Sequence, residues 1–90
     1  MQIKAVLAAL AATPILATAA LADNRCGNLP DAEWISVVEV ATIATEAGYT
    51  VREVERDDGC YELNVVDGQG QRFELDIHPG TGEIVRTERD

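Results

Sequence analysis

Residues 59–84 have the sequence GCYELNVVDGQGQRFELDIHPGTGEI, in which two alternating stretches flank a turn rich in glycine. Apolar residues occupy every second position from Tyr61 to Val65 and again from Phe73 to Ile77. A period of two indicates β-strands that bury one face. The intervening Asp67-Gly68-Gln69-Gly70 favours a reversal of the chain. This stretch therefore predicts two adjacent antiparallel strands.

Further strands are predicted on both sides of this pair. Residues 49–56 alternate imperfectly, because Val51 and Val54 are three positions apart and can share a face only if a bulge shifts the phase. Asp57-Asp58-Gly59 favours a tight hairpin turn after this strand. Beyond the pair, a last turn leads into a short fourth strand at residues 83–87.

Residues 30–48 have the spacing of a helix with one apolar side. Seven residues fall within one half of the helical wheel, namely Trp34, Val37, Val38, Val40, Ala41, Ala44 and Ala47. Asn28 and Asp31 offer capping oxygens at the start, and Gly48 is placed to end the helix. The many β-branched residues make this helix weak in isolation, so we expect it to dock on the sheet.

Together these elements predict an α+β domain of two layers, with one N-terminal helix packed on a three- to four-stranded antiparallel meander. The helix should cover the sheet face that carries Val51, Tyr61, Leu63, Val65, Phe73, Leu75 and Ile77. The opposite face, called the outer face below, carries Arg52, Glu62, Asn64, Val66, Arg72, Glu74 and Asp76. Ile35 and Ile43 fall on the polar half of the helix, where they are either isolated surface residues or partner contacts. Ile35 has the further alternative of extending the core around Trp34.

The first 22 residues have the pattern of a cleaved signal peptide. Lys4 precedes an apolar stretch, and Ala20-Leu21-Ala22 is a small-x-small end that a signal peptidase accepts. Polar and proline residues interrupt the stretch, which disfavours the alternative of a retained membrane anchor. We therefore expect cleavage after Ala22, one domain at residues 23–90 without a membrane span, and a periplasmic or secreted location.

The two cysteines, Cys26 and Cys60, predict one disulfide bond. An exported chain meets an oxidising compartment, and the sequence contains no other thiol to compete. Ligation of a metal by the pair is the alternative. A domain of this size usually needs such a cross-link, because it buries only about 60% of the surface of its unfolded chain.

The composition is strongly acidic. After removal of residues 1–22, six arginines face 16 carboxylates, which gives a formal charge of −10. This charge disfavours nucleic acid as a partner. It serves solubility, or else it attracts a basic partner surface or cations.

The residue inventory disfavours catalysis. The single serine, Ser36, and the single histidine, His78, are expected to have the helix and sheet between them, so we predict no catalytic residue and no enzyme. Glu74, Asp76 and His78 share one strand face, and weak binding of a divalent cation there is the alternative. We predict no dedicated metal site and no cofactor, because a charged strand face ordinarily serves solubility.

Several motifs resemble those of the small exported PepSY domains. They are Trp34 in the helix, Gly48-Tyr49-x-Val51, Asp58-Gly59-Cys60-Tyr61-Glu62, Asp67-x-x-Gly70 and Pro79-x-Thr81-Gly82-Glu83. The similarity covers nearly all of residues 23–90. One departure is His78, because family members often have Asp before this proline, and the lost carboxylate is expected to be a turn-capping oxygen.

The resemblance implies a small exported interaction module that regulates or inhibits a peptidase or modulates an envelope sensor. The expected partner surface is the outer face, with contacts from Arg52, Glu62, Val66, Arg72, Glu74 and Asp76. The alternative function is a domain that binds a small ligand or a divalent cation on the acidic strand face.

Overall fold

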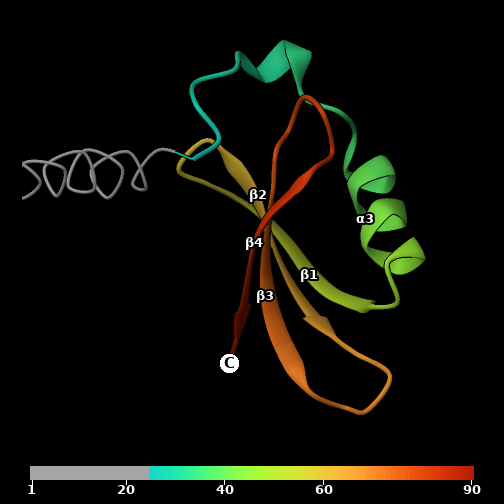
Figure 1. The fold of residues 1–90 in the computed structure, drawn as a ribbon. Helices are drawn as coiled ribbons and strands as arrows, with labels where there is room; N and C mark the ends of the chain where they lie inside the picture. Colours follow the sequence, from blue (N-terminus) through green and yellow to red (C-terminus); the bar gives the residue numbers. More distant parts are fainter. Residues whose placement is uncertain (1–24) are drawn as a thin grey trace, which may run out of the picture.

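The computed structural model describes residues 25–90, in which a helix packs on one face of a four-stranded antiparallel sheet (Figure 1). The elements are the 3-10 helix η3 (Asp31–Glu33), the α-helix α3 (Val37–Glu46) and the strands β1 (Thr50–Asp57), β2 (Cys60–Val66), β3 (Arg72–Ile77) and β4 (Ile84–Arg89). The strands lie in the order β1-β2-β3-β4, so β1 and β4 form the edges. This arrangement confirms the predicted α+β fold of two layers.

The core lies between α3 and the inner face of β2 and β3. Its fully buried side chains are Val40, Ala44, Tyr61, Leu63, Val65, Leu75 and Ile77. Leu63 pairs with Leu75 across the two central strands, so the apolar side chains of both strands point into the same layer. The alternation predicted for β2 and β3 is therefore confirmed.

The irregularity predicted for β1 is also present. Val51 pairs with Val65 and Glu53 pairs with Asn64, so Arg52 is the extra residue of a bulge. The bulge lets Val51 and Val54 both pack against the core. At the other end of β1, Asp58 and Gly59 have positive φ angles of 50° and 81°, as a two-residue hairpin turn of the primed type requires.

The helix begins later than predicted. Ser36 caps α3, because its Oγ accepts a hydrogen bond of 3.0 Å from the N–H of Glu39. The predicted start at residue 30, with Asn28 or Asp31 as the cap, was therefore wrong. The predicted end at Gly48 is confirmed, since Gly48 has a φ of 102° and Tyr49 donates its N–H to the Ala44 carbonyl.

Trp34 explains the gap between η3 and α3. Its backbone is extended, and its Nε1 donates a hydrogen bond of 2.8 Å to the Leu29 carbonyl. Its ring meets the edge of Tyr61 with centroids 4.9 Å apart, and the Arg56 guanidinium lies 4.5 Å from the Trp34 centroid. A continuous helix would carry Trp34 away from these partners, so their combined attraction outweighs the helical spacing.

The later start also rotates the buried face of α3. Val37 and Val38 were predicted on the apolar side, but they are 51% and 76% exposed. The buried face instead contains Val40 and Ala44, with the half-buried Ile43 beside them at helical spacing. Ile35 is half-buried and packs against the core, which confirms the alternative that it extends the core around Trp34. The placement of Ile43 on the polar half was wrong, since it is half-buried.

The turn between β3 and β4 packs under the start of α3. The Ile35 N–H donates to the Pro79 carbonyl at 2.8 Å, and the Tyr61 hydroxyl donates to the Ile35 carbonyl at 2.6 Å. Gly82 has a φ of 79°, which favours glycine, and a Cβ there would lie 2.6 Å from Cδ1 of Ile43, which would have to move. The last strand extends to Arg89, beyond its predicted end at residue 87.

His78 performs the capping for which a carboxylate was expected. Its Nδ1 accepts hydrogen bonds from the N–H groups of Gly80 at 3.0 Å and of Thr81 at 3.3 Å. An unprotonated imidazole nitrogen is an acceptor of the kind that an Asp side chain offers in the same turn. The turn therefore keeps a capping acceptor, which is a nitrogen in place of the carboxylate oxygen.

A disulfide bond joins Cys26 to Cys60, as predicted. Both cysteines are buried, and Cys60 stands at the start of β2 on the outer face. The segment that carries Cys26 approaches the first hairpin so closely that a Cβ on Gly59 would lie 2.2 Å from the Gly27 carbonyl oxygen. Among residues 25–90, no helix is long and apolar enough to cross a membrane.

We expect reduction of the Cys26–Cys60 bond to destabilise the domain strongly. The bond closes a loop across a sequence separation of 34, and chain entropy assigns about 3 to 4 kcal/mol to a loop of that length. Thermal unfolding of the oxidised protein and of the Cys26→Ser/Cys60→Ser variant measures the difference. Equal melting temperatures would show that the cross-link does not stabilise the fold.

We expect His78→Ala to lower the melting temperature by several degrees, because two backbone N–H groups lose their acceptor at a cost of about 1 kcal/mol. The matched variant His78→Asp restores an acceptor and should melt close to the wild-type temperature. Circular dichroism on the three proteins makes the comparison. If His78→Asp melts as low as His78→Ala, capping is not the role of this side chain.

Candidate functional site

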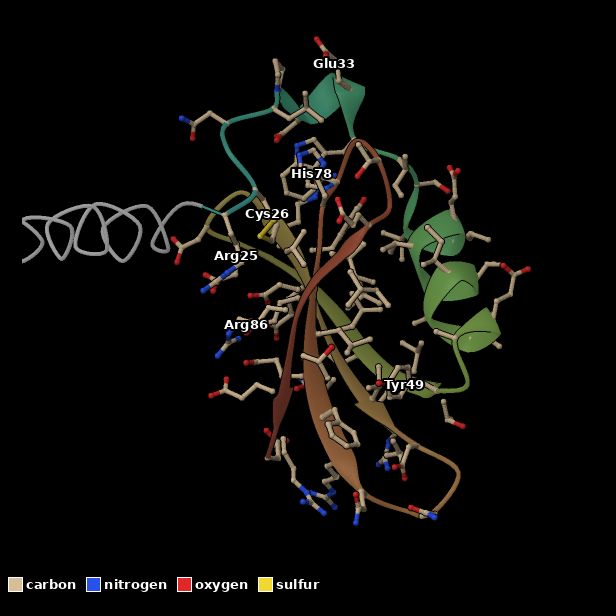
Figure 2. The ribbon with its side chains drawn as sticks, in the orientation of Figure 1. Arg25, Cys26, Glu33, Tyr49, His78 and Arg86 are labelled. Carbon is tan, nitrogen blue, oxygen red and sulfur yellow. A yellow bond between two sulfur atoms is a disulfide. The ribbon has the colours of Figure 1, made fainter. Side chains whose placement is uncertain are left out.

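The outer face of the sheet is the side away from α3, and it carries most of the charged side chains of the strands. Figure 2 shows Arg25 and Arg86 on this side, opposite the helix. The strand register places charged side chains in rows across the sheet: Glu55, Glu62, Asp76 and Arg86 form one row, and Glu53, Asn64, Glu74 and Glu88 form the next. The outer face is therefore an extended, mainly acidic surface.

Asp76 lies at the centre of one row, but it is only 7% exposed. Its Oδ2 lies 3.0 Å from Nη1 of Arg25 and 3.4 Å from Nη1 of Arg86. A buried carboxylate must be paired in this way, since an uncompensated charge at low exposure is strongly destabilising. The predicted partner contact Asp76 is therefore engaged inside the domain, where it fastens the segment before Cys26 to the sheet.

Glu62 and Glu74 form a close pair of carboxyl groups beside Asp76. A hydrogen bond to Glu74 raises the pKa of Glu62 to about 7, and burial and the negative charges of Glu74, Asp57 and Asp76 act in the same direction. Such a bond requires one carboxyl group to carry a proton. The charge of this part of the outer face therefore changes near neutral pH.

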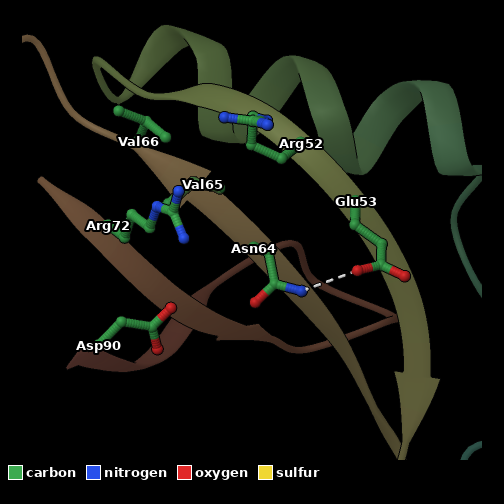
Figure 3. Close-up of a pocket in the computed structure, with 7 residues that line it drawn as sticks. All are labelled: Arg52, Glu53, Asn64, Val65, Val66, Arg72 and Asp90. Carbon is green, nitrogen blue, oxygen red and sulfur yellow. Dashed lines mark hydrogen bonds between the residues drawn. The ribbon is translucent and has the colours of Figure 1, made fainter. Parts of the chain in front are cut away.

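The other end of the outer face is less acidic and contains a hollow of about 230 Å³. Its lining residues are Arg52, Glu53, Asn64, Val65, Val66, Arg72 and Asp90 (Figure 3). The bulge in β1 brings Arg52 to this face together with Glu53, whose carboxylate accepts a hydrogen bond from Asn64. Three of the predicted contacts, Arg52, Val66 and Arg72, thus meet in one place.

A model of the family described as peptidase propeptide and YPEB domain, PepSY_2, matches residues 6–88. The chain belongs to the PepSY family. No curated protein and no solved structure matches it. PepSY domains are generally non-catalytic and are linked to the regulation of peptidases. The resemblance predicted from the motifs is confirmed, and it covers nearly the whole chain.

The side chains of this PepSY domain that could act in acyl transfer have other partners. Ser36 and His78 were expected to have the helix and sheet between them, whereas the backbone hydrogen bond from Ile35 to Pro79 joins their segments directly. Ser36 Oγ nevertheless accepts from Glu39, and His78 Nδ1 accepts from the turn that follows it. Within residues 25–90, no group of three or more His, Cys, Asp and Glu side chains is placed to hold a metal ion.

We expect Glu62→Gln to change the pH dependence of stability. The folded pKa of about 7 lies above the unfolded value of 4.5, so the stabilisation is fully present below pH 4.5 and is lost as the pH rises through 7. Glutamine cannot ionise and keeps the hydrogen bond to Glu74. The melting temperature of Glu62→Gln minus that of the wild type should therefore increase between about pH 5 and about pH 8.

The matched control is Glu46→Gln, which removes an exposed carboxylate from α3. Its melting temperature should change with pH in the same way as that of the wild type over the same pH range. A difference for Glu62→Gln that does not change with pH would contradict the shared proton.

Proposed function

We propose that this PepSY domain is a small exported regulator that binds a peptidase, and restrains its activity, through the outer face of the sheet. The observation that carries this proposal is that α3 covers only the inner face. Within residues 25–90, the outer face is covered at one end by the segment of Arg25 and Cys26, and Arg72 at the other end is exposed. The family match to peptidase propeptides supports the class of partner.

Export is supported by the disulfide bond and by the sequence of residues 1–22. A Cys26–Cys60 bond persists in an oxidising compartment, such as the periplasm or the extracellular space. The signal-like segment lies outside the described residues, so its cleavage after Ala22 stays a prediction. A peptidase in the same compartment would be the natural target of such a domain.

The chemistry of the outer face suits recognition of a protein. Acidic rows lie next to the Arg52 and Arg72 side chains and to the half-buried Val66, so the face offers both signs of charge and an apolar contact. Charge patterns of this kind steer association and select a partner, because like charges in contact cost several kcal/mol.

The test is affinity capture from an extract of the cell envelope, followed by binding and activity assays with the retained peptidase. The bait with Arg72→Glu and Glu74→Arg reverses the outer-face charges at constant net charge. The matched control bait, Arg89→Glu with Glu46→Arg, makes the same exchange away from the outer face, on β4 opposite Phe73 and on α3.

We expect the wild-type and control baits to retain one peptidase and to slow its cleavage of a substrate. The outer-face exchange should weaken this binding at least about tenfold without a matching loss of melting temperature. Equal binding by both exchanged domains would overturn the assignment of the face. Retention of a sensor protein in place of a peptidase would overturn the assignment of the partner.

A further inference from the structure

The hollow between β1 and β3 contains two arginines that form no salt bridge with the described residues. Among residues 25–90, ion pairs engage Arg25, Arg56 and Arg86, whereas Arg52, Arg72 and Arg89 form none. Arg89 lies opposite Phe73 on the inner face, so the arginines of the outer face without an ion pair are Arg52 and Arg72. Both of these side chains line the same hollow.

The geometry of the hollow fits one small group with a negative charge. Figure 3 shows the Arg52 and Arg72 side chains reaching from β1 and β3 toward the same space beside Val66 on β2. A volume of about 230 Å³ is below the range of about 300 to 1,000 Å³ for small-molecule pockets, so the hollow suits a group smaller than a drug-sized ligand. Guanidinium groups bind carboxylates through paired hydrogen bonds.

The rim of the hollow favours a carboxylate over a phosphate. Glu53 and Asp90 stand at its edge, and their charges oppose a dianion more strongly than a monoanion. Val66 is half-buried and adds an apolar wall, against which the methylene groups of a glutamate side chain can pack. The second hollow of the outer face offers no such site, because Arg25 and Arg86 are already paired with Asp76 there.

We propose that the hollow between Arg52 and Arg72 binds a glutamate side chain of the protein partner, with the carboxylate between the two guanidinium groups and the methylene groups on Val66. This inference deepens the proposed function and rests on it for the nature of the partner. It predicts a partner surface of mixed charge, with an acidic residue at this hollow and basic residues opposite the carboxylates of Glu62 and Glu74.

The test uses a probe that needs no partner. N-acetyl-glutamate N-methylamide is titrated into the ¹⁵N-labelled protein, and the Nε–Hε signals of all six arginines are followed by NMR at constant ionic strength. The neutral analogue N-acetyl-glutamine N-methylamide is titrated in parallel. The expected result is a saturable shift at Arg52 and Arg72 in the millimolar range, with the carboxylate only.

Three variants sharpen the result. Arg52→Gln/Arg72→Gln should weaken the affinity for N-acetyl-glutamate N-methylamide at least about tenfold. Arg89→Gln changes an arginine outside the hollow and should keep this affinity within about twofold of the wild-type value. Asp90→Asn removes a competing charge from the rim and should strengthen it. Equal shifts with the glutamine analogue, equal shifts at Arg89, or no saturable shift up to about 50 mM would overturn the inference.

The probe and the capture experiment fail independently. If the probe binds but the outer-face exchange does not affect the peptidase, the proposed function is wrong and the carboxylate site stands. If the peptidase binds through the outer face but the probe does not bind, the carboxylate site alone is wrong.

Discussion

The alternation of side chains along β2 and β3 is the constraint on which the rest of the structure depends. Because Leu63 and Leu75 are fully buried against α3, their neighbours Glu62, Asn64 and Glu74 must point to the other side. A slip of one residue would place these polar groups in the core. The same packing that stabilises the domain therefore also fixes the composition of its outer face.

The two ends of the outer face differ because of contacts made outside the central strands. At one end, the disulfide bond and the Arg25–Asp76 ion pair hold the N-terminal segment over the sheet. At the other end, Arg52 and Arg72 form no salt bridge within residues 25–90. Arg25 and Arg86 are thus paired with Asp76 inside the domain at the first end, whereas the proposed partner contact lies at the second end.

Short-range patterns predicted the strands well, because alternation and glycine turns are local. They failed where distant residues decide the outcome. Trp34 leaves the helix to meet Tyr61, which lies 27 positions further along the chain. The pairing of Asp76 with Arg25 spans 51 positions, so the burial of Asp76 had no local signal.

The bulge in β1 was predicted from Val51 and Val54, but the position of Arg52 and Arg72 beside the same hollow follows only from the strand register. The Ser-x-x-Glu pattern at Ser36 was a local signal for the true helix start.

In the proposed function, this PepSY domain meets its partner with the outer face of the sheet. Cross-saturation NMR on the complex with the captured peptidase tests it directly, because valine methyl groups report on both sides of the domain. Val66 lies on the outer face, whereas Val37 and Val38 are exposed on α3. We expect saturation transfer from the peptidase to the Val66 methyl groups and none to those of Val37 and Val38. Transfer to the helix valines with none to Val66 would contradict it.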